Sequence, residues 1–327
     1  MNVRTPIDGA TFILEAPENV PAIWGSGDQV AWSKGEPLIL AGPPGVGKST
    51  LAQQLALARC GVADDLSVLG MIVAPDDRRT LYVAADRPRQ IARSFRRMVT
   101  AKDKHRLSAS LLVWSGPLPF SPVKEPATLA AWLSLHGVGT VVIDSLKDIA
   151  MPLSQDDVGS AVNLIFQHVI AQDIEVLALH HQRKATGENK KPTTLADVYG
   201  SGWITAGAGS VLLLWGQPGD PIVELTHLKQ PALEIGPLAV VHDHLTGQSR
   251  LHEPVDLQAI VAAATNGGIT AADAARRLFT VADPDRNQIE RARRRLGDLV
   301  ARGQAVRVEG ERSKDPVHFR PVERRAA

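Results

Sequence analysis

The segment that most constrains this chain is a glycine-rich stretch, LILAGPPGVGKSTLAQQLALA, which spans residues 38–58. It contains the pattern G-x-x-x-x-G-K-[ST], with Gly42, Gly47, Lys48 and Ser49 at the specified positions. An apolar run precedes the loop and a helical pattern follows it, which is the context in which this motif binds phosphate. The segment therefore predicts a buried strand, a tight loop and a helix, as found in α/β folds.

The residue types of this loop suit a nucleotide phosphate chain bound together with Mg²⁺. The glycines let backbone N–H groups converge on phosphate, and the N-terminus of the helix adds positive potential. We expect Lys48 to reach the β- and γ-phosphates and the Ser49 hydroxyl to bind Mg²⁺. The predicted nucleotide contacts are Gly42, Pro43, Pro44, Gly45, Val46, Gly47, Lys48, Ser49 and Thr50.

Length and composition describe an ordinary globular protein of 327 residues, with room for one large and one small domain. The net charge of +1 predicts no global attraction to polyanions, so nucleic acid would have to be bound by local patches. Cys60 is the only cysteine, which excludes an internal disulfide. The N-terminus lacks a signal-peptide pattern, and no apolar run approaches the roughly 20 residues of a membrane span. We expect a cytoplasmic protein without a membrane segment.

Short apolar runs alternate with helical patterns after the first 36 residues, which we expect to lead in as strands. Runs that are apolar throughout suit a parallel sheet with helices on both faces. Later runs, separated by turns rich in Gly, Pro and Asp, are predicted to be antiparallel strands that extend one edge. We assign residues 1–251 to this α/β, RecA-like domain. The expected strands are residues 37–41, 80–85, 111–115, 141–144 and 174–181, followed by 210–216, 222–229 and 236–244.

A different pattern occupies residues 252–327, where three helical segments precede two short strands around a turn, the order of a winged helix. Residues 255–327 carry 14 Lys and Arg against 10 Asp and Glu, and the third helix is arginine-rich. Such a helix can contact DNA phosphates, and we predict that Arg291, Arg294 and Arg295 do so. The alternative is a solvated helix in a module that binds another protein, such as a replication protein.

Two aspartates end predicted strands and are candidates for the chemistry of hydrolysis. Asp144 closes VVID, where it can hold a water of the Mg²⁺ shell next to Ser49. Asp86 follows LYVAA, a strand expected to lie beside the phosphate-loop strand, and its carboxylate can polarise an attacking water. Their alternative roles are a turn residue for Asp144 and a helix cap for Asp86.

Histidines and lysines gather around HHQRK and the polar loop after it. His180 or His181, together with Gln182, could hydrogen-bond the γ-phosphate and relay its loss to that loop. The loop is too long for a simple connection, and Lys184, Lys190 and Lys191 could follow a DNA backbone, unless it is only a surface loop. His242 and His244 alternate on an expected strand and are predicted to face solvent.

These motifs, taken in order, resemble RecA-like ATPases of the hexameric replicative-helicase branch, the RepA-like and DnaB-like ATPases of plasmids, phages and actinobacteria. The resemblance rests on the phosphate loop, VVIDSLKD, HHQRK, GSGWITAGAGSVLLL and LTHLKQ, and it covers residues 24–251. It implies ATP-driven movement on DNA, most readily single-stranded DNA, by a homo-oligomeric ring. It further implies Asp144 as the Walker B acid, Asp86 as the base, His180 or His181 as the γ-phosphate sensor, residues 184–199 near the DNA channel, and Lys229 acting on the nucleotide of a neighbouring subunit.

Two departures from this family pattern affect the predicted rate of hydrolysis. The family usually has Glu at the base position, where this chain has the shorter Asp86. Relatives commonly have K-x-R, whereas Lys229 is followed by Gln230 and Pro231. An arginine finger contributes roughly 10³–10⁵ in rate, so two hypotheses stay open. One is a helicase or translocase; the other is a slowly hydrolysing, ATP-gated DNA-binding switch, loader or recombinase-like filament.

Overall fold

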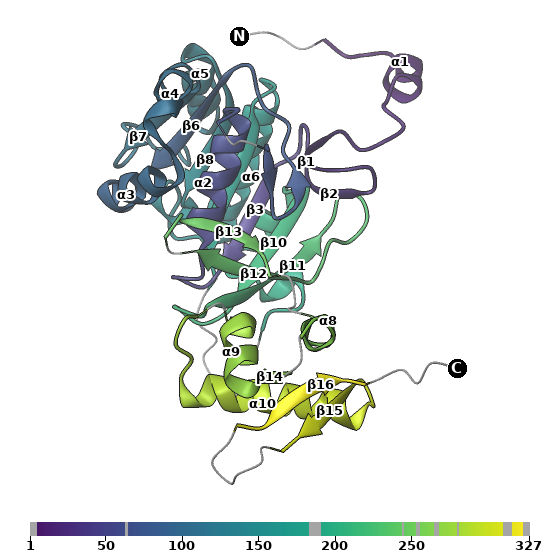
Figure 1. The fold of residues 1–327 in the computed structure, drawn as a ribbon. Helices are drawn as coiled ribbons and strands as arrows, with labels where there is room; N and C mark the ends of the chain where they lie inside the picture. The colour runs from purple at the N-terminus through teal and green to yellow at the C-terminus, as the bar shows by residue number, and fades with distance from the viewer. Residues whose placement is uncertain are drawn as a thin grey trace. The chain divides into compact units, whose positions relative to one another are not determined.

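The computed structural model describes residues 5–62, 65–182, 191–243, 245–252, 256–264, 268–279, 281–309 and 316–322. The chain divides into two compact units, Met1–His252 and Glu253–Ala327. In Figure 1 the larger unit runs from purple to green and the smaller unit from yellow-green to yellow.

A nine-stranded sheet forms the centre of the larger unit, in the order β13-β12-β11-β10-β3-β9-β8-β6-β7 (Figure 1). Six neighbouring strands, from β10 to β7, are parallel, and β11, β12 and β13 continue the sheet antiparallel. This arrangement confirms the predicted RecA-like sheet with antiparallel strands at one edge. The strands are β3 (Leu38–Gly42), β6 (Arg79–Ala84), β7 (Leu111–Ser115), β8 (Val138–Asp144), β9 (Glu175–His181), β10 (Ser210–Trp215), β11 (Ile222–Lys229), β12 (Leu238–Asp243) and β13 (Gln248–Leu251).

Two details of the predicted sheet were wrong. The strand that precedes Asp86, β6, does not lie beside the phosphate-loop strand β3, because β9 and β8 lie between them. The first of the supposed antiparallel strands, β10, pairs parallel with β3 and only then antiparallel with β11. Sheet order depends on how the connections cross over the sheet, and a strand's own residues do not reveal it.

Helices cover both faces of the sheet, as its uniformly apolar strands require. One face packs on α2 (Lys48–Arg59) and α3 (Pro88–Met98), with Leu51 and Leu55 in its core. The other face packs on α5 (Pro126–Leu135) and α6 (Asp156–Ile170), with short α7 (Gly202–Ala206) nearby. The buried side of α6 has helical spacing: Val158, Val162, Ile165, Phe166 and Val169.

Smaller elements complete the larger unit. Helix α1 (Gly9–Leu14) precedes a hairpin of β1 (Ala22–Ser26) and β2 (Gln29–Ser33), and β4 (Ser67–Val68) pairs with β5 (Met71–Ile72). The buried Trp24 indole on β1 donates a hydrogen bond to the Val68 carbonyl at 2.9 Å, which links the two hairpins. Helix α4 (Lys104–Ser110) and three short 3₁₀ turns, Ala101–Asp103, Leu146–Asp148 and Leu195–Asp197, fill the connections.

The smaller unit has its own core and a three-stranded antiparallel sheet. Its elements in chain order are α8, β14, α9, α10, β15 and β16, and its sheet order is β14-β16-β15. The core includes Val261, Leu278, Leu296 and Phe319. The third strand, β14, was absent from the sequence prediction because it is only two residues long. The bounds are α8 (Leu257–Ala262), β14 (Ile269–Thr270), α9 (Ala271–Phe279), α10 (Arg286–Ala301), β15 (Ala305–Val308) and β16 (His318–Pro321).

In the part of the chain that the structure describes, no helix combines the length and the apolar character needed to cross a membrane.

Candidate active site

The glycine-rich loop lies where β3 ends and α2 begins, as the motif predicts. Gly47 is the N-cap of α2 in the left-handed conformation, with φ of 92°, which favours glycine. No side chain among the described residues caps the first turn of α2. Because the first N–H groups of a helix have no partner within it, this turn offers them to an anion.

Lys48 is folded back over the loop that it belongs to. Its ammonium group donates hydrogen bonds to the carbonyl oxygens of Gly42 and Pro43, at 2.8 and 2.7 Å. The side chain is buried, and burial lowers the pKa of Lys48 to about 8, although the charge of Asp144 opposes the shift. Lys48 therefore places a positive charge where the loop's N–H groups converge.

Asp144 ends β8 and is buried next to the loop. Its carboxylate accepts a 2.7 Å hydrogen bond from the Tyr82 hydroxyl on β6. Burial raises the pKa of Asp144, while hydrogen bonds from Tyr82 and Ser49 and the charge of Lys48 counteract the shift. The structure thus brings together Lys48, Ser49 and Asp144, as the motifs predicted.

The same oxygens suit Mg²⁺ held jointly with phosphate. Mg²⁺ prefers oxygen ligands and usually keeps several waters while it binds one or two carboxylates and substrate phosphates. The Ser49 hydroxyl and the Asp144 carboxylate match this donor set, since their interaction contributes to the pKa of Asp144. Within the described ranges, no group of three or more His, Cys, Asp or Glu side chains could hold a metal ion. The pair of Ser49 and Asp144 is therefore suited to an ion that it shares with nucleotide phosphates.

Asp86 lies just beyond β6, beside the end of β8. The register pairs Ala84 with Asp144, and the Ala85 N–H donates to the Asp144 carbonyl at 3.3 Å. The Asp86 carboxylate accepts a hydrogen bond from the Lys147 ammonium at 3.1 Å, and this contact lowers the pKa of Asp86. Asp86 therefore reaches the site from the strand next to β8, although β6 does not touch β3.

Lys147 is a site residue that the sequence prediction missed. It follows β8 in the 3₁₀ turn Leu146–Asp148, and its ammonium also lies 3.4 Å from Asp148. Its charge is one of the causes that lower the pKa of His181. The available signal was its position three residues after Asp144, in DSLKD.

The two histidines at the end of β9 differ in their surroundings. His180 is buried, its Nε2 contacts the Tyr199 carbonyl oxygen, and its ring stacks on that of Tyr199. His181 is half-buried, and burial together with the charges of Lys48 and Lys147 lowers its pKa to about 4. His181 is therefore neutral at pH 7 and is electrostatically coupled to the loop lysine, whereas His180 holds the segment around Tyr199.

Gln182 connects the phosphate loop to that segment. Its backbone N–H donates to the Gly42 carbonyl at 2.9 Å. Its side-chain amide accepts from the Tyr199 N–H at 3.0 Å and donates to the Asp197 carbonyl. One residue thus contacts both the start of the loop and residues 197–199.

Lys229 lies toward the opposite end of the sheet's strands from the phosphate loop. It pairs with Val211 on β10, which pairs with Ile39 at the start of β3, whereas the loop follows the other end of β3. At about 3.3 Å per residue, three strand residues separate these levels by roughly 10 Å. The structure therefore does not bring Lys229 together with Lys48 and Asp144 of its own chain.

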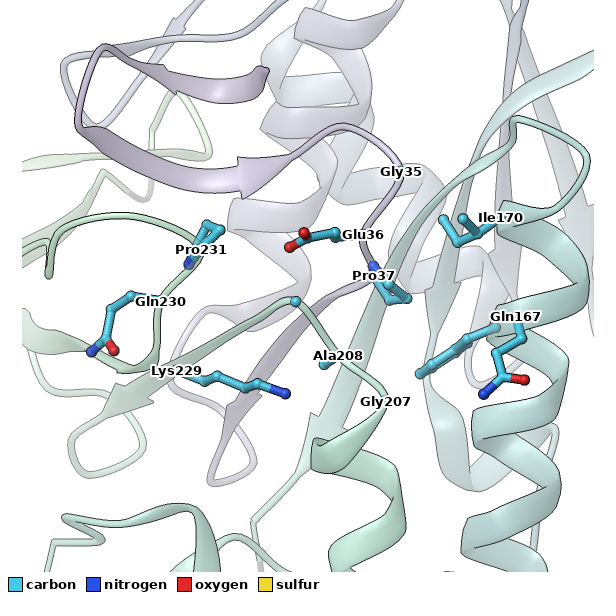
Figure 2. Close-up of a pocket in the computed structure, with 12 residues that line it drawn as sticks. Gly35, Glu36, Pro37, Gln167, Ile170, Gly207, Ala208, Lys229, Gln230 and Pro231 are labelled. Carbon is cyan, nitrogen blue, oxygen red and sulfur yellow. The ribbon is translucent and has the colours of Figure 1, made fainter. Parts of the chain in front are cut away.

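A pocket of about 540 Å³ surrounds Lys229 at that end of the strands (Figure 2). Its walls come from the segment before β3, from α6 and from the residues between α7 and β10. Figure 2 shows the Lys229 side chain extended toward Ala208, with Glu36 on another wall. The ammonium donates to the Ala206 carbonyl at 2.9 Å, at the end of α7.

The predicted DNA contacts are dispersed. Lys191 forms an ion pair with Glu224 on β11. Arg291, Arg294 and Arg295 are exposed on α10, while Ala292 and Leu296 of the same helix are buried. Lys184 and Lys190 lie outside the described residues.

Loop, acid and sheet together define a P-loop ATPase with a RecA-like fold. A family model described as an AAA domain matches residues 12–187, and the chain belongs to that family. Among solved structures, the ATPase domain of a DnaB-like helicase matches with a TM-score of 0.50 and 15% identity, over 76% of this chain and 100% of that chain. The search of curated proteins found no match. The resemblance to RecA-like ATPases inferred from the motifs is thereby confirmed.

Proposed function

We propose that this protein is an ATP-driven DNA motor, a helicase or translocase that works as a homo-oligomer with ATP bound between subunits. The observation that carries the proposal is the convergence of Lys48, Asp144 and Asp86 at one end of the strands, with Lys229 toward the other. A head-to-tail assembly would place the Lys229 side of one subunit against the phosphate loop of the next. Such an interface closes into a ring when the rotation between subunits allows it.

In this proposal the residues of one chain divide the chemistry of hydrolysis among them. The N–H groups at the start of α2 and the Lys48 ammonium bind the β- and γ-phosphates, which requires Lys48 to leave the Gly42 and Pro43 carbonyls. Mg²⁺, when bound, neutralises charge that develops on the phosphate oxygens. Ser49 and Asp144 would hold it, with Tyr82 keeping the Asp144 carboxylate in one orientation. Asp86 accepts the proton of the attacking water.

The end of β9 provides a route from the γ-phosphate to DNA. Neutral His181 can donate a ring N–H to a phosphate oxygen, which a pKa of about 4 permits at neutral pH. Gln182 and His180 contact residues 197–199, at the end of the polar loop. A shift of these side chains after phosphate loss would therefore move a segment that we propose lies near single-stranded DNA.

We infer that the smaller unit is a winged helix. Support comes from its three helices and from its antiparallel sheet, in which β14 joins the two strands of the wing. The exposed arginines of α10 suit contact with DNA phosphates. A replication protein is the alternative partner for the same surface.

Steady-state ATP hydrolysis with and without single-stranded DNA tests the motor, with Lys48→Ala as the blank. We expect DNA to stimulate hydrolysis strongly in the wild type and Lys48→Ala to abolish it. Displacement of a labelled strand from a partial duplex should then depend on ATP and Lys48. Weak hydrolysis that ignores DNA would contradict the motor.

A second candidate function is an ATP-gated DNA-binding switch with slow turnover. Two observations favour it: Asp86 is held in an ion pair with Lys147, and Lys229 is followed by Gln and Pro where relatives have K-x-R. A switch predicts DNA affinity that changes between ATP and ADP, together with hydrolysis that DNA does not accelerate.

A further inference from the structure

The hairpin of β12 and β13 contacts the phosphate loop through the side chain of His242. The Nε2 atom of His242 lies 2.8 Å from the carbonyl oxygen of Val46, inside the loop. Its Nδ1 atom lies 2.8 Å from the Ser249 hydroxyl, on the strand paired with its own. The sequence prediction that His242 faces solvent was therefore wrong; His244 lies outside the described residues.

The chemistry of these partners determines the protonation of the ring. A carbonyl oxygen can only accept, so Nε2 carries a hydrogen and donates it to Val46. In the neutral ring Nδ1 then accepts the hydroxyl hydrogen of Ser249. His242 is thus held at both nitrogens.

The bond to Val46 orients a group that faces the nucleotide. The Val46 carbonyl and the Gly47 N–H belong to one planar, trans peptide unit, so they point in opposite directions. When His242 holds the oxygen on the outer side, the Gly47 N–H is directed inward, toward the space where the loop's N–H groups converge. Gly47 also allows the ring to approach, because a Cβ there would overlap the His242 imidazole.

The hairpin itself is attached to α2, so His242 has a fixed base. The Ser249 N–H donates to the Gln54 side chain at 2.7 Å, and the Gln54 amide donates back to the Ser249 carbonyl at 3.2 Å. Ser249 is buried, and Gln54 lies on the helix that follows the loop. Val46, His242, Ser249 and Gln54 therefore form a closed set of contacts around the start of α2.

We propose that His242 is a positioning residue of the phosphate loop, which directs the Gly47 N–H toward a nucleotide phosphate by holding the Val46 carbonyl. The proposal rests on the proposed nucleotide binding, and it concerns affinity for the phosphate chain. Its removal leaves the peptide of Val46 and Gly47 free to rotate, so the cost appears in nucleotide binding and in KM. The chemical step, which depends on Asp86 and Asp144, keeps its rate.

Equilibrium titration of the full-length protein with a fluorescent ADP analogue tests this, together with kcat and KM for ATP. We expect His242→Ala to weaken binding about tenfold, the equivalent of one hydrogen bond, and to raise KM similarly with kcat within about twofold. His242→Gln should recover most of the affinity, because its amide can present an N–H to the same carbonyl. His105→Ala, an exposed histidine on α4, is the matched control and should bind like the wild type.

Three outcomes separate the possibilities. Unchanged affinity in His242→Ala, with a wild type that binds, would overturn the positioning role. Equal losses in His242→Ala and His242→Gln would also overturn it, since the ring would then act only by filling space. A wild type that binds no better than Lys48→Ala would instead refute the proposed nucleotide site itself. Thermal unfolding of each variant without nucleotide shows whether it is folded.

Discussion

Single side chains hold each acidic group of the site in place. Asp144 has Tyr82 and Asp86 has Lys147, and both partners are hydrogen-bonded to a carboxylate oxygen. The two partners act differently, because Tyr82 is buried and uncharged, whereas Lys147 is partly exposed and charged. Each contact yields a separate prediction.

Tyr82→Phe should move the acid limb of the pH–rate profile to higher pH. Burial raises the pKa of Asp144, and the Tyr82 hydrogen bond counteracts that rise. Without the hydroxyl the pKa of Asp144 rises further, so the carboxylate is protonated, and unable to hold Mg²⁺, at a higher pH. ATP hydrolysis measured from pH 5 to 8 at saturating ATP checks this, and a higher Mg²⁺ requirement should accompany it. A profile that superimposes on the wild type would show that this hydrogen bond does not tune Asp144.

Asp86→Asn should lower kcat by about 100-fold or more while nucleotide binding is retained. An amide of the same shape cannot accept a proton, and a general base contributes roughly 10²–10⁴ in rate. Lys147→Met is the matched control, because it removes the same ion pair but keeps the carboxylate. We expect it to cost much less, about tenfold at most, through lost orientation of Asp86. Equal losses in both variants would mean that Asp86 serves only to hold Lys147.

Sequence reasoning at this scale found the residues that belong to motifs and missed those defined by tertiary contacts. Lys48, Ser49 and Asp144 follow fixed positions in a strand and loop, so their convergence could be predicted. His242 reaches Val46 across 196 residues of sequence, and Lys147 meets Asp86 across 61. Neither lies in a recognised pattern, so only the folded chain shows what each contacts.

The buried ion pair between Arg59 and Asp76 stabilises the junction of α2, β8 and the segment before β6. The guanidinium donates to the Asp76 carboxylate at 2.8 Å and to the Thr140 hydroxyl at 3.0 Å, and both charged side chains are largely buried. Arg59 ends α2, so this network fixes the far end of the helix that the phosphate loop begins.

Arg59→Met should destabilise the larger unit by about 3–5 kcal/mol, because it leaves the Asp76 charge buried without its partner. Asp76→Leu should do the same to Arg59. The double variant should be more stable than either single one, since no unpaired buried charge remains. Urea unfolding followed by circular dichroism measures all three. Additive losses in the double variant would show that the two residues act independently.

At the scale of whole elements, long uniform patterns were predictable and short or relational features were not. The buried strands and α10 have enough residues to show their pattern, and each was predicted close to its observed bounds. Strands of two residues, such as β4, β5 and β14, carry no periodicity. The parallel pairing of β10 and the separation of β6 from β3 depend on crossovers, which no local pattern encodes.

The whole molecule separates the nucleotide loop and Lys229 toward opposite ends of the strands of one sheet. Register places Lys229 beside Val211 and Ile39, so it cannot approach its own phosphate loop without breaking the sheet. If Lys229 contributes to hydrolysis, it must therefore act on another subunit. This conclusion can be tested without knowing the size of the assembly.

Mixing two inactive variants, Lys48→Ala and Lys229→Ala, should restore ATP hydrolysis. In a mixed oligomer some interfaces combine an intact phosphate loop from the Lys229→Ala chain with an intact Lys229 from the Lys48→Ala chain. Random head-to-tail assembly of equal amounts makes about one interface in four of this kind. We expect roughly a quarter of wild-type activity where each variant alone has almost none, measured after subunit exchange.

The control for this mixture is the double variant, Lys48→Ala with Lys229→Ala, which should not rescue either single variant. Lys229 also bonds to the end of α7, so Lys229→Ala could lose activity through that contact instead. Complementation distinguishes the two causes, because a defect within the Lys229→Ala chain itself would leave its phosphate loop inactive beside any neighbour. A mixture that stays inactive despite demonstrated co-assembly would remove Lys229 from the catalytic interface.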